Sequence, residues 1–126
     1  MVTVILDTAV LVDVYRNRKR AADTLITYKN NRFAITIFTY TEFLAGAALL
    51  NKKDARKFLK DYPVINFDAN SASILKTMCM QYLLPSKHLG DFLIAASAMA
   101  NKAAVITPNY KDFSKFKNLE VIRYLI

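Results

Sequence analysis

The stretch VTVILDTAVLVDVYRN, Val2 to Asn17, joins an apolar strand to an acid and then to a second apolar segment. Val2 to Leu6 is apolar at nearly every position, which is typical of a strand in the centre of a sheet with both faces covered. Asp7 follows at once, and the residues behind it predict a short helix over 8–15. Asp7 therefore has two interpretations: the N-cap of that helix, or one member of an acidic cluster that holds a metal ion.

Short apolar segments alternate with helical patterns along the rest of the chain. We expect strands over 32–36, 64–67, 103–107 and 119–125, and helices over 19–29, 39–50, 52–62, 69–83 and 89–101. The strand over 64–67 is short and is expected at a sheet edge, Asp68 should cap the helix after it, and Pro85 should break the chain. This alternation predicts an α/β domain with a central parallel sheet. Without repeats or linkers, residues 1–126 are expected to form one domain.

Composition limits the classes of function. A hydrophobic content of 54% with 3 Pro and 2 Gly excludes a disordered chain. The net charge of +8 suits a polyanionic partner, either a nucleic acid or an acidic protein. Cys79 is the single cysteine, no basic segment precedes the first apolar run, and Phe92 to Ala100 is too short to cross a membrane. We therefore expect a cytoplasmic protein without a disulfide or a membrane anchor.

Four polar residues from distant parts of the chain are expected at one edge of the sheet. Asp7 ends the first strand, and Asn109 follows the strand over 103–107. Glu42 lies one turn into the helix after the second strand, and Asp91 begins the helix GDFLIAASAMA. In open α/β sheets, ligands bind outside the carboxyl ends of the strands, where these residues should meet.

Each acid also has a structural interpretation. Asp7 and Asp91 are possible helix N-caps, and Glu42 has the spacing of a capping box with Thr39 as the N-cap. Together these interpretations are weaker, because carboxylates crowded at one site repel one another unless they are protonated or bridged by a cation. A hard cation with oxygen ligands, such as Mg²⁺ or Mn²⁺, removes that repulsion.

Four blocks of the sequence together resemble one family: ILDTAVLVDV, TYTEFLAG, LGDFLIAASAMA and VITPNYKDF, in this order and at these separations. The resemblance is to the PIN-domain nucleases, and within them to the VapC toxins of VapBC toxin–antitoxin pairs. It implies a three-layer α/β/α fold and a Mg²⁺- or Mn²⁺-dependent endoribonuclease. It also implies a homodimer and a cognate VapB-type antitoxin that blocks the active site.

Carried over by position, the resemblance assigns metal-site acids to Asp7, Glu42 and Asp91. The fourth metal-site place, often Asp in the family, is Asn109 here. Asp112 stands where toxins with Asn in that place often carry an acid, so we count it with the three acids as a catalytic candidate. Asp112 has an alternative interpretation as the cap of the short turn DFSK, with its side chain in solvent.

The surroundings of these acids supply further candidates. Ala9 departs from the Asn or Ser that commonly follows "DT" in the family, which removes a hydrogen bond next to the site. Thr8 and Thr107 are candidate site hydroxyls, whereas Thr36 and Thr39 are better explained as strand and cap residues. His88 is interpreted as structural or exposed. Four basic residues are candidates for RNA backbone binding: Arg16, Arg18, Lys87 and Lys111.

Other α/β proteins with an acid at a strand end fit less well. A receiver domain needs an adjacent acidic pair on the first strand, and a haloacid-dehalogenase-type phosphatase needs Asp-x-Asp, where this chain has Ala9. One alternative remains, a catalytically weakened PIN-fold module that binds RNA or a partner protein. The neutral Asn109 is the observation in its favour.

Overall fold

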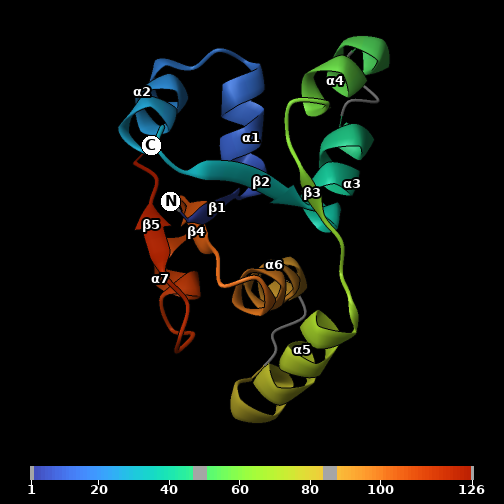
Figure 1. Ribbon diagram of the computed structural model, residues 1–126, viewed down its shortest axis with the longest axis vertical. Coiled ribbons are helices and arrows are strands. Elements are labelled where there is room, and N and C mark those ends of the chain that lie inside the picture. The colour runs from blue at the N-terminus through green and yellow to red at the C-terminus, as the bar shows by residue number, and fades with distance from the viewer. Residues whose placement is uncertain (1, 47–50, 84–87, 126) are drawn as a thin grey trace.

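Five parallel strands form one sheet in the order β3-β2-β1-β4-β5 (Figure 1). The computed structural model describes residues 2–46, 51–83 and 88–125. The strands are β1 (Thr3–Leu6), β2 (Arg32–Thr36), β3 (Val64–Ile65), β4 (Ala104–Thr107) and β5 (Val121–Arg123). The two-residue β3 is at an edge of the sheet, as the sequence predicts.

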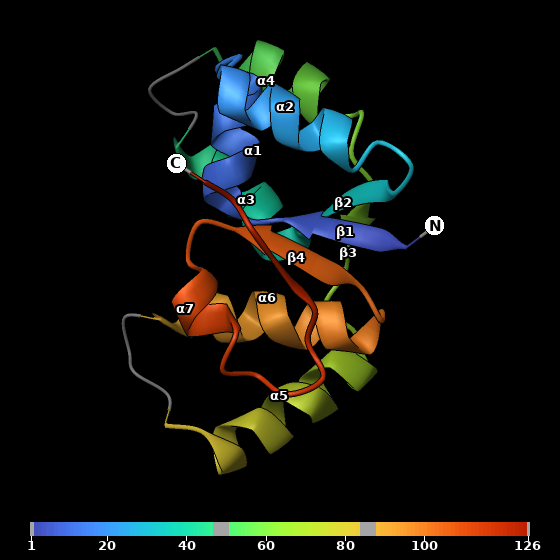
Figure 2. The ribbon, with the colours of Figure 1, turned by 90° about the vertical axis from the view of Figure 1, so that its left-hand side faces the viewer.

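Helices cover both faces of the sheet, which confirms the three-layer α/β/α fold (Figure 2). On one face lie α1 (Thr8–Tyr15), α2 (Lys19–Thr27), α3 (Ile37–Gly46) and α4 (Lys52–Leu59). On the other face lie α5 (Ala69–Gln81), α6 (Leu89–Ala100) and the one-turn α7 (Tyr110–Phe113). No helix in these described ranges is long and apolar enough to span a bilayer.

The central strand β1 contributes side chains to two separate hydrophobic cores. Val4 and Leu6 point to the core under α1 to α4, whereas Ile5 points to the core that contains Phe92 of α6. Successive side chains of a strand point to opposite faces, so a strand between two helical layers is apolar throughout. β1 pairs with β2 on one side and β4 on the other, so all three strands end at the same edge.

The predicted capping box of the third helix is wrong. α3 begins at Ile37, and its first turn is capped by Thr36, whose hydroxyl accepts a hydrogen bond from the Thr39 backbone N–H at 3.1 Å. Thr39 is therefore inside the helix, and Glu42 is too far along it to be the N3 residue. The predicted extension of this helix over 47–50 lies outside the described residues.

The other predicted elements are present; those over 8–15 and 32–36 have the predicted ends, and others have shifted ends. Asp68 is the N-cap of α5, as predicted, and its carboxylate accepts a hydrogen bond from the Ser71 N–H at 2.8 Å. Several predicted helices end earlier in the structure, at Thr27, Leu59 and Gln81. The predicted break at Pro85 lies outside the described residues.

Candidate metal centre

Asp7 lies at the carboxyl end of β1, where it has the N-cap position that one of its two interpretations predicts. It occupies the N-cap position of α1, and its Oδ1 accepts a hydrogen bond from the Thr8 N–H at 2.8 Å. Its Oδ2 accepts a second one from the Thr107 hydroxyl at 2.6 Å, at the end of β4. Burial raises the pKa of Asp7, and these two hydrogen bonds oppose the increase. Its carboxylate is thus held rigidly in a poorly solvated position.

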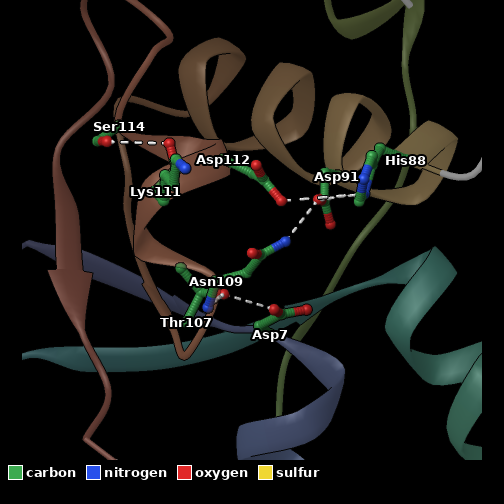
Figure 3. Close-up of polar contacts among 8 residues, drawn as sticks. All are labelled: Asp7, His88, Asp91, Thr107, Asn109, Lys111, Asp112 and Ser114. Carbon is green, nitrogen blue, oxygen red and sulfur yellow. Dashed lines mark hydrogen bonds and ion pairs between the residues drawn. The ribbon is translucent and has the colours of Figure 1, made fainter. Parts of the chain in front are cut away.

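Asp91 is held from the opposite side of this edge by α6. It is the third residue of that helix, which begins at Leu89, so it is not the N-cap. Its Oδ2 accepts a hydrogen bond from the Asn109 amide at 2.9 Å (Figure 3). Burial raises the pKa of Asp91, and the negative charge of Asp7 raises it further. The two carboxylates therefore repel each other across this edge.

His88 and Asp112 complete a group of three ligand-type side chains with Asp91. The His88 Nδ1 lies 3.6 Å from Asp91 Oδ2 and 4.0 Å from Asp112 Oδ2. One potential ligand atom from each of the three residues lies within 4.8 Å of the others. Figure 3 shows Asp112 of α7 pointing toward Asp91, with His88 beside them. The orientation of Asp112 matches the interpretation as a site residue and not the alternative as a solvent-facing cap.

Glu42 reaches this edge through a chain of hydroxyl groups. Thr8 Oγ1 donates a hydrogen bond to Glu42 Oε1 at 2.9 Å and lies 3.0 Å from Thr39 Oγ1. Because the Thr8 backbone also donates to Asp7, this threonine connects the two acids. Thr39 is therefore part of the polar network and not the cap that we expected. Glu42 is exposed and, among the described residues, lies outside the group of His88, Asp91 and Asp112.

The predicted RNA-binding residues are more scattered than expected. Arg16 and Arg18 are at the far end of α1, about 12 Å along the helix from Asp7. Lys111 is exposed on α7, next to the site, and Lys87 lies outside the described residues. Of the predicted basic residues that the structure describes, Lys111 is therefore the one beside the acids.

The structure adds two residues that the sequence interpretation missed on the same side. The Arg123 guanidinium lies over the Tyr110 ring, 4.5 Å from its centroid. Both residues, with Asn109 and Lys111, line a hollow of about 330 Å³. The contact between Arg123 and Tyr110 joins β5 to α7, and no local sequence pattern predicts it. His88, which we interpreted as structural or exposed, does have a local sequence pattern, because it is three residues before Asp91 in a helical segment.

The donor set fits a hard divalent cation. Carboxylate and amide oxygens are the ligands that Mg²⁺ and Mn²⁺ prefer, and Asp7, Asp91, Asp112 and Asn109 provide them. Burial raises the pKa of Asp91, the charge of Asp7 raises it further, and a bound cation would offset that repulsion. A larger hollow, about 660 Å³, lies between α5 and the loop before β5. It includes Lys102, beyond the opposite end of α6 from Asp91, so it is separate from this site.

Comparison with known proteins agrees with the fold. A profile of the PIN domain family matches residues 4–119, and the chain therefore belongs to the PIN domain family. No curated protein matches the chain.

Several solved structures match over nearly the whole chain. A toxin–antitoxin complex from Klebsiella pneumoniae is 27% identical, with a TM-score of 0.79 and coverage of 94% of this chain and 95% of that one. VapBC2 from Rickettsia felis, bound to a promoter DNA fragment, is 24% identical, with a TM-score of 0.78 and coverage of 98% and 99%. FitAcB from Neisseria gonorrhoeae is 21% identical, with a TM-score of 0.74 and coverage of 94% and 96%. These matches confirm the resemblance to VapC-type PIN domains.

Proposed function

We propose that the protein is a Mg²⁺- or Mn²⁺-dependent endoribonuclease and the toxin of a toxin–antitoxin pair. One observation carries the proposal: in a PIN domain, Asp91 and Asp112 lie together with His88 at the carboxyl edge of the sheet, and Asp7 is near enough for its charge to add to burial in raising the pKa of Asp91. A group of carboxylates at this edge is suited to holding a cation next to a phosphodiester bond of the substrate. RNA as substrate is inferred from the family resemblance and from the net charge of +8.

The chain's own residues would position the reacting groups. Asp7, Asp91 and Asp112 would hold the ion, with Glu42 at the other end of the Thr8 network. When bound, a divalent ion supplies Lewis acidity, which favours deprotonation of water and offsets charge on the phosphoryl oxygens.

Hydrogen bonds fix the orientation of these acids. The Thr107 hydroxyl donates to Asp7 and also accepts from the Asn109 N–H at 3.0 Å, and the Asn109 amide donates to Asp91. One threonine and one asparagine therefore set the relative positions of two carboxylates. Holding the acids before substrate arrives lowers the cost of reorganisation during the reaction.

The hollow next to Asn109 is suited to the RNA strand. Arg123 and Lys111 offer positive charge for the phosphates, and the Tyr110 ring offers an aromatic face. The phosphate of the scissile bond would then lie between this hollow and the acidic group. Arg16 and Arg18, at the far end of α1, would contact more distant nucleotides.

Cleavage of RNA by the pure protein tests the proposal. Wild-type protein, purified without its antitoxin, should cleave single-stranded RNA in Mg²⁺ or Mn²⁺ and should lose cleavage in excess chelator. Asp7→Asn should lower the rate at least about 100-fold, because loss of groups that only support metal ligands already costs 10- to 100-fold. Asp23→Asn on α2 is the matched control, since Asp23 pairs with Lys19 at the surface. Cleavage that survives the chelator, or the Asp7→Asn change, would refute a metal-dependent site.

A second function is favoured by Asn109, which offers an amide where a fourth carboxylate is common in the family. In that case the protein binds RNA or a partner protein and does not cleave. RNA binding by the pure protein without metal-dependent cleavage would support this alternative.

The proposed partner is a VapB-type antitoxin, because the solved structures similar to this chain include toxin–antitoxin complexes. The product of the neighbouring reading frame, when co-expressed, should copurify with the protein and suppress its cleavage of RNA. An active enzyme in that complex would contradict the proposal.

A further inference from the structure

We propose that His88 is a direct ligand of the divalent ion, through Nδ1, and that it shifts the preference of the site from Mg²⁺ toward Mn²⁺. The inference rests on the metal site of the proposed function but not on cleavage of RNA. The resemblance to PIN-domain nucleases assigns the site to acids and an amide, and it gives His88 no role.

The distances around His88 suit a shared ion better than direct contact. A charge-assisted N–H···O hydrogen bond is about 2.7–2.9 Å long, whereas Nδ1 lies 3.6 Å from Asp91 and 4.0 Å from Asp112. Two ligands of one ion, each about 2.1 Å from it, lie about 3.0 to 4.2 Å apart. Both of the observed distances fall within this range.

The backbone holds the imidazole in this position. His88 precedes the first residue of α6, and Asp91 follows one turn later, so both side chains lie at the same end of that helix. The His88 side chain makes no capping hydrogen bond to α6, and its Nδ1 faces Asp91 and Asp112 instead. Its side chain is 34% exposed and that of Asp91 is 19% exposed, so both border a solvent-accessible site.

The His88 imidazole also adds a ligand to a site in which Asn109 supplies no negative charge. In this structure the Asn109 amide nitrogen points at Asp91, so the residue orients that acid and offers no negative charge. Asp112 and His88 both lie beside Asp91 and together offer one carboxylate and one ring nitrogen as ligands. Nitrogen ligands favour Mn²⁺ and later transition metals, whereas Mg²⁺ strongly prefers oxygen.

Electron paramagnetic resonance of bound Mn²⁺ tests the proposal directly. His88 is the only histidine of the chain, so protein without a polyhistidine tag has one imidazole. Its Mn²⁺ complex should show ¹⁴N coupling of the imidazole type. The coupling should change to the ¹⁵N pattern when the protein is made with imidazole-¹⁵N histidine. This labelling experiment needs no variant and does not depend on RNA cleavage.

His88→Gln provides the second measurement. The variant should lose the nitrogen coupling and bind Mn²⁺ about tenfold more weakly, and its Mg²⁺ affinity, measured by competition, should change less than about twofold. Its thermal melting curve checks the fold, and Asp23→Asn is the control. An unlabelled and a labelled wild-type spectrum that are identical would overturn the assignment, as would equal losses for Mn²⁺ and Mg²⁺. A protein that binds Mn²⁺ through His88 but cleaves no RNA would refute the proposed function alone.

Discussion

Asp112 shows how one residue can decide the charge of the site. With Asn109 neutral, the carboxylates at the sheet edge come from Asp7, Asp91 and Asp112, and Glu42 is attached through Thr8. Asp112 is one-third exposed, yet its carboxylate faces His88 and Asp91. Its negative charge also raises the pKa of Asp91, though less than burial does.

The first prediction follows from this position. Asp112→Asn should raise the Mg²⁺ concentration for half-maximal RNA cleavage severalfold or abolish cleavage, because one charge fewer faces the ion. Asp61→Asn, at an exposed acid near the end of α4, should leave the value unchanged. Equal values for Asp112→Asn and wild type would leave Asn109 as the sole candidate for the fourth place.

At the scale of elements, the N-cap of α5 helps to stabilise the second helical layer. Asp68 ends the segment after β3, and its carboxylate binds the Ser71 N–H, which keeps its pKa below the ordinary value. α5 packs on α6, which carries Asp91. The start of α5 therefore supports the helix that presents a site acid.

Asp68→Ala should lower the stability of the fold, because the N-cap hydrogen bond to the Ser71 N–H is lost. We therefore expect the melting temperature to fall. Differential scanning calorimetry measures the change, with Asp61→Ala as a control outside any helix. A fall no larger than that of the control would show that the cap adds nothing.

Much of the architecture is predictable from the sequence because single strands and helices carry their own signals. β1 is apolar at Val4, Ile5 and Leu6 because these residues enter cores on opposite faces, and such a run is visible without tertiary information. The start of α3 was misplaced because two overlapping patterns exist: Thr36 and Thr39 are three apart, and so are Thr39 and Glu42. The structure uses the first pattern, and local spacing alone does not distinguish them.

The candidate acids are visible in the sequence for the same reason. Asp7 follows a recognisable strand and Asp91 lies in the first turn of a recognisable helix, so a parallel sheet predicts that they lie at the same edge. The approach of His88 to Asp112 depends on how α6 packs against α7, and that packing leaves no periodic pattern. The stacking of Arg123 on Tyr110 is equally non-local.

At the scale of the whole molecule, one acid ties the C-terminal segment to the N-terminal helices. Asp13 of α1 accepts hydrogen bonds from Arg20 Nε at 2.8 Å and from the hydroxyl of Tyr124 at 2.7 Å. The hydrogen bond with Arg20 is the main reason why the pKa of Asp13 lies below its ordinary value. Burial, followed by the bond to Asp13, raises the pKa of Tyr124 to about 12.

The resulting pH dependence has a definite sign. A carboxylate with a lowered pKa in the folded state stabilises the fold above its unfolded pKa near 4, and this contribution is lost as the pH falls through the folded value. Asp13→Asn should therefore cost about 1 kcal/mol at neutral pH, since Arg20 is partly exposed and screened. Urea denaturation should show this difference shrinking toward zero at strongly acid pH. A difference that is independent of pH would mean that the charge of Asp13 is irrelevant.

The predicted homodimer needs an apolar surface, and the structure changes which residues supply it. In the sequence, four apolar residues on and after α5 are candidates for such a surface: Met78, Met80, Tyr82 and Leu83. Met78 is in fact buried and Tyr82 packs edge-on against Phe116, whereas Met80 is 82% exposed and Leu83 is 92% exposed. Met80 and Leu83 are therefore the residues on this surface that we expect a second copy to cover.

We predict a particle of twice 14.3 kDa at micromolar concentration. Met80→Glu should shift the protein toward the monomer, because a charge in an apolar interface is costly. Ile26→Glu, at an exposed residue of α2, is the matched control and should leave the mass unchanged. Sedimentation velocity measures both masses, and a wild-type monomer would contradict the prediction.

The parallel pairing of β1 with β4 also governs when activity arises during synthesis. β1 carries Asp7, but its neighbour β4 and the acid Asp112 come about 100 residues later in the chain. At a synthesis rate of about 5–20 residues per second, the ribosome needs about 5–20 s between Asp7 and Asp112. Throughout that interval the nascent chain has the first acid of the site without its partners. Under the proposed function, the chain would be inactive for most of its own translation, and an antitoxin that is already present would have that time to meet it before the site is complete.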